Sequence, residues 1–259
     1  MKKLKKRYAA LRFKIDKFLR KNNINNKYSF NKILSYKNKY KNKRCFIIGT
    51  GPSLEINQLE LLKNEYTFSM NSIVLSFKDT SWRPTYYFIQ DGRAFKKLKD
   101  KILPLDKKDI FIGINYRYDG VKIDDKEFYK CNFYPLYMRP DEKIYKIKFS
   151  DDCYEIVWDG TTVVYSILQM AMYMGFSEIY LMGIDCDYTS GDKKNIVEYV
   201  NNTNNIITES KMLYTFSLAK QYANKKGIKI YNLNEKGNLY MYPRKNLFEV
   251  LKRGNNNVC

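Results

Sequence analysis

Apolar positions recur along this chain with two different spacings, and the spacings divide the sequence into two parts. Within residues 1–22 the apolar side chains fall three or four positions apart, as on one face of an α-helix. They are Leu4, Tyr8, Leu11, Ile15, Phe18 and Leu19. From Arg44 onward, short apolar runs alternate with longer amphipathic stretches and glycine-containing turns. The first part therefore predicts an amphipathic helix and the second a globular domain.

The short apolar runs predict the strands of a mostly parallel sheet, because strands covered on both faces need apolar side chains on both sides. We expect strands over 45–48, 67–70, 86–90, 110–114, 178–182 and 228–231. Helices are predicted over 163–173 and about 207–225, since Gly175 and Gly227 follow them as stop signals. Strands that alternate with helices are typical of a Rossmann-like α/β fold with helices on both faces of the sheet.

The expected domain boundaries follow from the same pattern. Residues 1–43 are predicted to be a basic amphipathic helix followed by a linker rich in Asn and Lys. Residues 44–259 are predicted to form one Rossmann-like nucleotide-binding domain. Within it, residues 116–157 are aromatic and mixed in charge, which indicates a lid-like insertion.

The net charge of +20 is concentrated at the N-terminal end. Residues 1–44 hold 17 Lys and Arg but a single acidic residue, Asp16, whereas the rest of the chain is nearly balanced. A basic amphipathic helix suits an anionic membrane surface, where each Lys or Arg adds about 1 kcal/mol. Two alternatives stay open: the helix packs on its own domain with a solvated basic face, or the segment binds nucleic acid.

Composition excludes several kinds of chemistry. The 259 residues are 44% hydrophobic, as in a globular protein, and include no histidine. A Ser-His-Asp triad, a Cys-His pair and a His-ligated zinc are therefore excluded. Five cysteines without a CxxC pair indicate neither a disulfide framework nor a metal cage. No apolar run of 18 residues and no signal-peptide core occur, so we expect a reducing, cytoplasmic setting.

A glycine-containing turn follows the first predicted strand, at the edge where parallel α/β sheets bind ligands. It consists of Gly49, Thr50, Gly51, Pro52 and Ser53. Its glycines permit close approach of a phosphate to backbone amides, and the helix expected beyond it favours negative charge. The turn lacks the Lys of a Walker loop and the third glycine of GxGxxG, so it matches neither motif.

Further polar residues follow other predicted strands. Asn71, Asp91 and Asn115 occupy such positions, where they either bind a sugar or a base or form an Asx-turn or helix cap. The stretch 159–162, with the sequence DGTT, either caps the helix at 163–173 or presents hydroxyls and a helix dipole to a ligand.

Two blocks of sequence together resemble known families. IIGTGPSL with a following YYFIQDGRAF, and DGTTVVYSILQMAMYMGFSEIYLMGIDCDY with a following GIKIYNL, resemble two related bacterial groups. One is the MptE-like family, named after a 6-hydroxymethylpterin pyrophosphokinase and linked to glycosylation of surface polysaccharides and flagellin. The other is the family 42 bacterial sialyltransferases. The resemblance covers roughly residues 44–235, and its second block is the more specific.

The sialyltransferase resemblance implies a CMP-activated nonulosonic acid donor, inversion at the anomeric centre and no essential metal. Tyr180 and Tyr188 lie near the place where paired tyrosines of that family assist the departing phosphate, although Tyr180 is alternatively a core residue. Our candidates for binding the donor are Gly49, Thr50, Gly51, Pro52, Ser53, Asn71, Asp91, Asn115, Gly160, Thr161, Thr162 and Gly183.

The resemblance breaks at the catalytic base. Those sialyltransferases use a histidine shortly before the last long helix, and the corresponding place here holds Ser210 beside Glu209. Glu209 is a candidate base because a partly buried Glu can have a raised pKa; alternatively, it is a helix residue favoured by the dipole. Asp185 and Asp187 are the other candidates.

The leading prediction is a cytoplasmic glycosyltransferase of bacterial surface-glycan synthesis, meaning capsule or lipooligosaccharide. It would transfer a sialic-acid-like sugar from a CMP-linked donor to a glycan or glycolipid acceptor, without a further cofactor, while residues 1–22 contact the membrane. One alternative is an ATP- and Mg²⁺-dependent 6-hydroxymethylpterin diphosphokinase, in which Asp91, Asp185 and Asp187 would hold the metal. The other is a non-catalytic nucleic-acid-binding protein, although no specific nucleic-acid motif is present. A homo-oligomer is left open.

Overall fold

A computed structural model describes residues 30–105, 109–114, 133–139, 147–187 and 205–255. It also describes single residues of the N-terminal segment, at positions 8, 11, 14, 15, 18, 19, 22 and 24.

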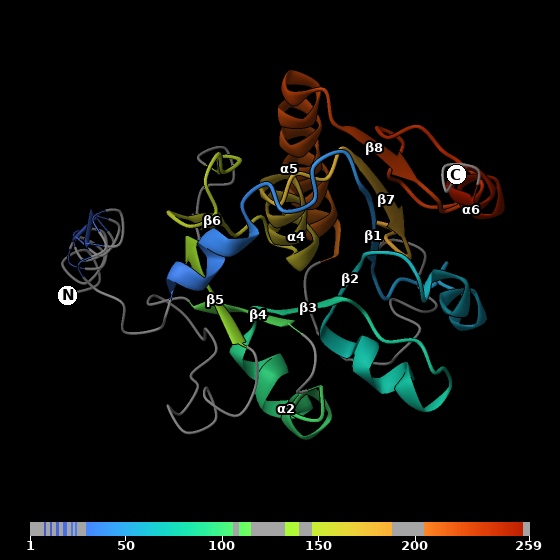
Figure 1. Ribbon diagram of the computed structural model, residues 1–259, viewed down its shortest axis with the longest axis horizontal. Helices are drawn as coiled ribbons and strands as arrows, with labels where there is room; N and C mark the ends of the chain where they lie inside the picture. Colours follow the sequence, from blue (N-terminus) through green and yellow to red (C-terminus); the bar gives the residue numbers. More distant parts are fainter. Residues whose placement is uncertain are drawn as a thin grey trace.

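The described strands form one parallel sheet in the order β6-β5-β4-β3-β2-β1-β7-β8 (Figure 1). The strands are β1 (Arg44–Ile48), β2 (Thr67–Met70), β3 (Tyr86–Ile89), β4 (Asp109–Ile114), β5 (Phe133–Arg139), β6 (Val157–Trp158), β7 (Glu178–Met182) and β8 (Lys229–Asn232). The six predicted strands are all present, and the predicted Rossmann-like α/β fold is confirmed.

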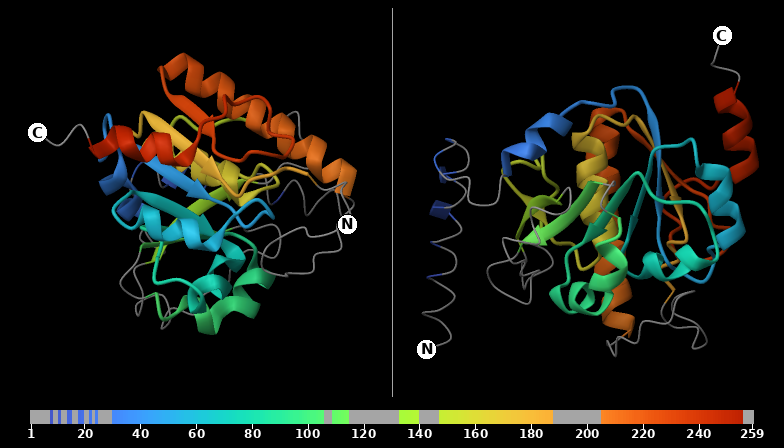
Figure 2. Two further views of the ribbon diagram at one scale, coloured as in Figure 1. Left: turned by 90° about the vertical axis from the view of Figure 1, so that its right-hand side faces the viewer. Right: turned by 60° about the horizontal axis from the view of Figure 1, so that its bottom comes forward.

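Helices cover both faces of the sheet (Figure 2). One face carries η1 (Phe30–Tyr36), α4 (Val163–Tyr173) and α5 (Asn205–Lys226). The other carries η2 (Ile56–Leu62), η3 (Asn71–Lys78), α2 (Gly92–Ile102) and α6 (Leu247–Asn255). None of these described helices has the length and apolar content needed to cross a bilayer.

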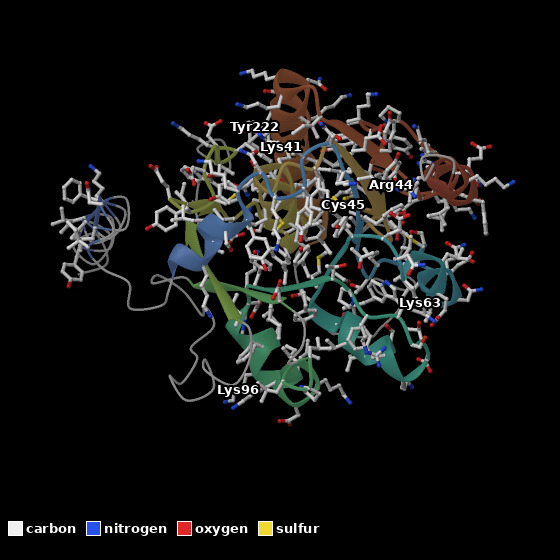
Figure 3. The ribbon with its side chains drawn as sticks, in the orientation of Figure 1. Lys41, Arg44, Cys45, Lys63, Lys96 and Tyr222 are labelled. Atoms are coloured by element: carbon white, nitrogen blue, oxygen red, sulfur yellow. The ribbon has the colours of Figure 1, made fainter. Side chains whose placement is uncertain are left out.

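Alternate side chains of each strand enter the two cores, which is why the strands read as continuous apolar runs. In β1, Cys45 and Ile47 pack beneath α4, whereas Phe46 and Ile48 pack on the opposite face. Figure 3 shows Cys45 in the interior of the molecule and Lys96 at its periphery. Both cores are therefore built from the same strands.

The packed domain begins earlier than the predicted boundary at residue 44. Ile33 and Tyr36 of η1 are 1% and 2% exposed and belong to the core, and the Tyr36 hydroxyl donates to the Asp109 carboxylate. The backbone amides of Asn38 and Tyr40 donate to carbonyls at the end of α4, at 3.0 and 2.8 Å. Residues 30–43 are thus part of the domain and not a linker, because their apolar side chains fill space beside β4 and β5.

Part of the predicted insertion at 116–157 also belongs to the sheet. β5 pairs with β4 over five residues, and β6 pairs with Met138 and Arg139 of β5. Pro135 in β5 argues against a strand in the sequence, since proline cannot donate to a ladder. It is tolerated here because β6 pairs only farther along β5, so Pro135 has a strand partner on one side within the described residues. The other residues of the range, 116–132 and 140–146, lie outside the described part of the chain.

We expect Ile33→Ala to destabilise the protein by about 2–4 kcal/mol, because a fully buried side chain would leave a cavity in the core. Leu34→Ala is the matched control, since the neighbouring Leu34 side chain is 45% exposed. Denaturant unfolding monitored by circular dichroism measures both variants. Equal stabilities of the two would show that residues 30–43 do not belong to the folded domain.

Candidate functional site

The order of strands in the sheet reverses between β1 and β7. From β1 the strands follow one another outward to β6, and β7 and β8 are then added on the other side of β1. Ligands of open α/β sheets bind at the carboxyl ends of the strands beside such a switch point. The residues that follow β2, β1 and β7, three adjacent strands, therefore form the centre of the candidate site.

The amides of the glycine turn after β1 are occupied by the protein itself. Gly49 donates to Met182 O and Gly51 donates to Gly183 O, both at 2.8 Å. A Cβ on Gly49 would lie 2.3 Å from Gly183 O, so only glycine permits this approach. The predicted cradle of free glycine amides is thus not formed. The glycines serve instead to pack the turns after β1 and β7 together, and the segment beyond them is the short 3₁₀ helix η2.

Asp185 inserts its carboxylate into the same turn. Its Oδ2 accepts a hydrogen bond from the Ser53 amide at 3.0 Å, and a Cβ on Gly51 would lie 2.3 Å from that oxygen. The Asp185 residue is only 7% exposed. One carboxylate oxygen therefore occupies the position at the turn where the sequence predicted a phosphate.

Three oxygens at this edge are buried without a hydrogen-bond partner. They are Ser53 Oγ, Asn71 Oδ1 and Asp185 Oδ1, from the ends of β1, β2 and β7. Asn71 also adopts a left-handed backbone with φ of 47°, and its carbonyl accepts from the buried Tyr87 hydroxyl at 2.6 Å. Unpaired buried polar atoms are costly, and these three lie at adjacent strand ends where open α/β sheets bind ligands, which makes them candidate ligand contacts.

The loop after β8 clamps the loop that carries Asp185. Asn234 Oδ1 accepts from the Gly183 amide and Asn234 Nδ2 donates to Ile184 O, both at 2.8 Å. The Asn238 amide donates to Asp185 O at 2.8 Å, and Asn238 Nδ2 donates to Glu209 Oε1 at 2.8 Å. Asn238 thereby links the backbone of Asp185 to the carboxylate of Glu209.

Cys186 follows Asp185 in the same loop and is buried. Burial, helped by the nearby charges of Asp185 and Glu209, raises the pKa of its thiol to about 12. Cys186 is therefore protonated at neutral pH and does not act as a thiolate nucleophile.

A second carboxyl group, Asp159, lies at the same edge of the sheet, beyond β6. Its Oδ1 accepts from the Thr161 amide at 3.1 Å and from Gln90 Nε2 at 3.4 Å, while Gln90 Oε1 accepts from Ser166 Oγ at 2.8 Å. Burial raises the pKa of Asp159, the Thr161 amide opposes this, and the charge of Asp91 raises the pKa further. A carboxyl group with a raised pKa is suited to accept a proton near neutral pH.

Several predicted ligand-binding residues serve local structure. Asp91 caps α2, since its Oδ1 accepts from the amides of Arg93 and Ala94 at 2.7 and 3.1 Å. Thr162 caps α4 by accepting from the Val164 amide at 3.3 Å. Thr161 adopts φ of 67°, a left-handed conformation that is strained for a β-branched residue and that turns the chain from Asp159 into α4.

The structure removes Tyr180 from the catalytic candidates. Its hydroxyl donates to Glu178 at 2.9 Å, at the start of β7, and its ring stacks between Phe46 and Tyr231. Tyr180 is thus a core residue directed toward the amino ends of the strands, opposite the candidate site. The physical reason is that both faces of β7 are covered by helices, so a tyrosine within this apolar strand packs in the core.

The predicted Asn115 and Tyr188 lie outside the described residues. Sequence reasoning missed Gln90, Asn234 and Asn238. Gln90 and Asn234 follow β3 and β8, so the rule that identified Asn71 would have found both if applied to every strand. Asn238 carries no comparable signal, because it lies in an irregular loop.

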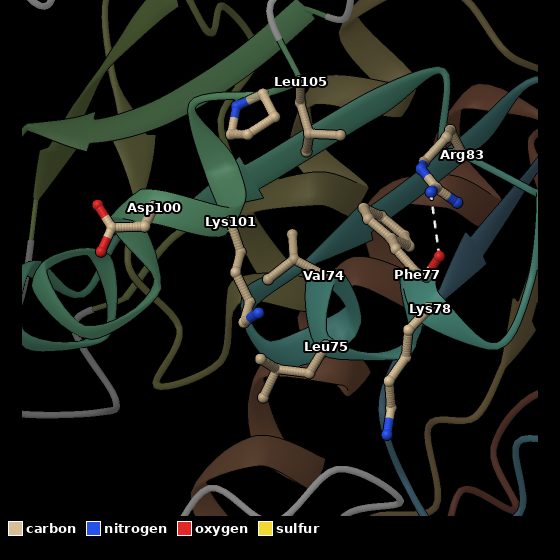
Figure 4. A pocket seen from close by; sticks show the side chains of 9 residues that line it. Val74, Leu75, Phe77, Lys78, Arg83, Asp100, Lys101 and Leu105 are labelled. Atoms are coloured by element: carbon tan, nitrogen blue, oxygen red, sulfur yellow. Dashed lines mark hydrogen bonds between the residues drawn. The ribbon is translucent and has the colours of Figure 1, made fainter.

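A pocket elsewhere on the molecule does not coincide with this site. It lies between η3 and α2 and is lined by Val74, Phe77, Arg83, Lys101 and Leu105 among others (Figure 4). Arg83 precedes β3 and Leu105 precedes β4, so the pocket is at the amino ends of the strands. The guanidinium of Arg83 is also engaged, by the carbonyls of Phe77, Thr80 and Trp82 at 2.7–3.1 Å. Across the ranges that the structure describes, no group of three or more His, Cys, Asp or Glu could hold a metal ion.

We expect Asp159→Asn to gain stability relative to the wild type as the pH rises. Because the pKa of Asp159 is raised in the folded state, the unfolded chain ionises first, and the wild type loses stability as the pH rises above the ordinary Asp value. The variant keeps an Oδ1 acceptor and has no such loss. Thermal unfolding between about pH 3 and 7 measures the difference. The exposed Asp100→Asn is the control, and a difference independent of pH would contradict the raised pKa.

Comparison with known proteins places the chain in a family. A comparison with curated protein sequences gave no match. Among solved structures, the sialyltransferase CstII from Campylobacter jejuni in complex with CMP aligns with a TM-score of 0.42 at 17% identity, over 78% of this chain and 84% of that chain. The same enzyme in complex with CMP-3FNeuAc aligns with a TM-score of 0.44 at 15% identity, over 78% and 85%. The family model described as 6-hydroxymethylpterin diphosphokinase MptE-like matches residues 18–191, which is more than half of the chain. The chain therefore belongs to the MptE-like family.

Proposed function

We propose that this protein is a glycosyltransferase of bacterial surface-glycan synthesis. Its donor is a CMP-linked, sialic-acid-like sugar, and its acceptor is a glycan or glycolipid. Transfer is inverting and needs no metal. The observation that carries the proposal is the group of buried, unpaired oxygens of Ser53, Asn71 and Asp185 at the switch point.

These oxygens select for the part of a ligand that donates hydrogen bonds. Asn71 Oδ1 and Asp185 Oδ1 can only accept, and the Ser53 hydroxyl can do either. A phosphate at neutral pH offers acceptors and negative charge, so it would leave the carboxylate unmatched. Ribose hydroxyls, sugar hydroxyls and the amino group of cytosine offer donors. The nucleoside or sugar end of a donor thus matches this edge of the sheet. The block that begins with DGTT and ends with GIDCDY resembles sialyltransferases, which favours cytidine as the nucleoside.

The reaction requires a group that removes a proton from the acceptor. The acceptor oxygen forms a bond to the anomeric carbon, the bond from that carbon to the CMP phosphate breaks, and CMP leaves as an anion. The hydroxyl proton passes to a protein base, which is a carboxylate in this chain without histidine. We assign this role to Asp159, because its raised pKa makes its carboxylate a stronger base than an ordinary Asp. Glu209, Asp185 and Asp187 remain the other candidate bases.

The family description supports a second candidate, a 6-hydroxymethylpterin diphosphokinase. The amino group and ring N–H of a pterin are donors, so they would also match the oxygens of Asn71 and Asp185. This reaction would transfer a diphosphate from ATP with Mg²⁺ to the pterin hydroxyl. The two candidates therefore differ in the nucleotide and in the need for a divalent cation.

We expect the protein to bind CMP without Mg²⁺, and Asn71→Ala to weaken that binding by about tenfold or more through loss of an acceptor. Asn42→Ala is the matched control, because Asn42 has the same left-handed backbone, with φ of 61°, away from the site. Isothermal calorimetry with CMP, CDP, UDP, GDP, ATP and 6-hydroxymethylpterin, each with and without Mg²⁺, tests the proposal. Binding of ATP with Mg²⁺ and of the pterin, but not CMP, would establish the diphosphokinase instead.

We expect Asp159→Asn to lower the rate of sugar transfer by about 10²–10⁴-fold with little change in donor affinity, as for loss of a general base. Glu209→Gln is the comparison, because it keeps the acceptor for Asn238 while removing a charge. Release of CMP from a CMP-sugar in the presence of acceptor measures the rate. If Glu209→Gln lowered this rate strongly and Asp159→Asn left it nearly normal, Glu209 and not Asp159 would be the base.

A further inference from the structure

The N-terminal helix exposes the apolar face that its sequence pattern predicts. Tyr8, Leu11, Ile15 and Phe18 are helical, and their exposed fractions are 67%, 57%, 48% and 63%. They recur at intervals of three and four residues, so they lie along one side of the helix. These four side chains are therefore not buried by the described part of the domain, whereas Leu19 is half-buried.

This stripe differs from the other exposed apolar residues. Leu61, Tyr66, Tyr214 and Phe248 are exposed singly on separate elements, as is usual on protein surfaces. On the N-terminal helix, by contrast, the exposed side chains are consecutive members of one face. A continuous apolar face needs a partner, because its exposure to water is unfavourable.

The chain that follows this segment is docked on the domain. The helix ends near Asn22, whose backbone and side-chain nitrogens both donate to Phe18 O, at 3.1 and 2.8 Å. From residue 30 the chain is docked on the core through Ile33 and Tyr36, and Lys37 pairs with Asp152 at 2.9 Å. Figures 1 and 2 show the described part of the helix beside the sheet, on the side of β5 and β6. The sequence that carries the apolar stripe thus precedes a segment that is docked on the domain from residue 30 onward.

Charge identifies the partner. Residues 1–22 hold ten Lys and Arg and one acidic residue, Asp16. Lys14, the described basic residue within the helix, is exposed. An apolar stripe flanked by cations is complementary to a surface that is apolar inside and anionic outside.

We propose that this helix binds the surface of an anionic phospholipid bilayer, lying in its plane with Tyr8, Leu11, Ile15 and Phe18 in the boundary between headgroups and acyl chains. An RNA would satisfy the cations but not Leu11 and Ile15, which are aliphatic and offer no ring for base stacking. A second copy of the chain would cover the stripe but would place two strongly cationic segments side by side. The inference does not depend on the proposed transferase activity.

Vesicle co-sedimentation of the full-length protein tests the proposal. The vesicles are phosphatidylcholine alone and phosphatidylcholine mixed with phosphatidylglycerol, at low and high salt. The variant is Leu11→Glu with Phe18→Glu, which places carboxylates in the stripe. The matched control is Leu61→Glu with Phe248→Glu, since these residues are 45% and 52% exposed on the domain. Thermal unfolding and CMP calorimetry of each variant report separately on the domain and its site.

We expect the wild type to bind the anionic vesicles, to release them at high salt and to bind phosphatidylcholine alone far less. The stripe variant should lose about tenfold or more of its binding, whereas the control should keep it. Three results would overturn the proposal: equal vesicle binding by the stripe variant and the wild type, no binding by the wild type, or a dimer in light scattering that only the stripe variant abolishes. Binding of an RNA oligonucleotide that exceeds vesicle binding and survives the stripe substitutions would overturn it as well.

Discussion

The hydrogen bond from the Ser53 amide to the Asp185 carboxylate organises the candidate site. It joins the turn after β1 to the loop after β7 across the point where the strand order reverses. The bond is possible only because Gly51 has no Cβ, which would otherwise meet the carboxylate. It fixes one oxygen of Asp185 and leaves the other buried and unpaired beside those of Ser53 and Asn71. The clamp by Asn234 and Asn238 then holds this loop against Glu209.

Much of the fold could be predicted from local pattern, because buried parallel strands must be apolar on both faces. α4 was predictable at both ends, since Thr162 caps it and Gly175 follows it with φ of 91°. The failures were cases where tertiary contacts decide the outcome. Pro135 argues against β5, which forms because one neighbouring strand suffices there. Residues 30–43 are polar on average, and only the burial of Ile33 and Tyr36 places them in the domain.

The candidate site was predictable in position but not in detail. Ser53, Asn71 and Asp185 were predictable because they follow strands, and the carboxyl ends of parallel strands lie at one edge of the sheet. The spacing of the glycines could not reveal that their amides bond to Met182 and Gly183, because that depends on how closely β7 approaches β1. The surroundings of Asp159 likewise depend on burial and on Gln90, which is 69 residues away in the sequence. Tyr180 is the opposite case. Its place in the block that resembles sialyltransferases predicted a catalytic role, whereas its ring stacks on Phe46 in the core.

The docking of residues 30–43 determines where this chain can be shortened. The sequence pattern suggests a truncation at Arg44, immediately before the first strand. That truncation would remove Tyr36, whose ring packs edge-on against Tyr86 and Phe111 with centroid distances of 5.8 and 5.4 Å. The aromatic cluster along β3 and β4 would then be exposed to solvent. Removal of the residues before Phe30 would leave the cluster covered. A fragment for crystallisation should therefore begin near residue 30, where the basic helix is lost and the core remains whole.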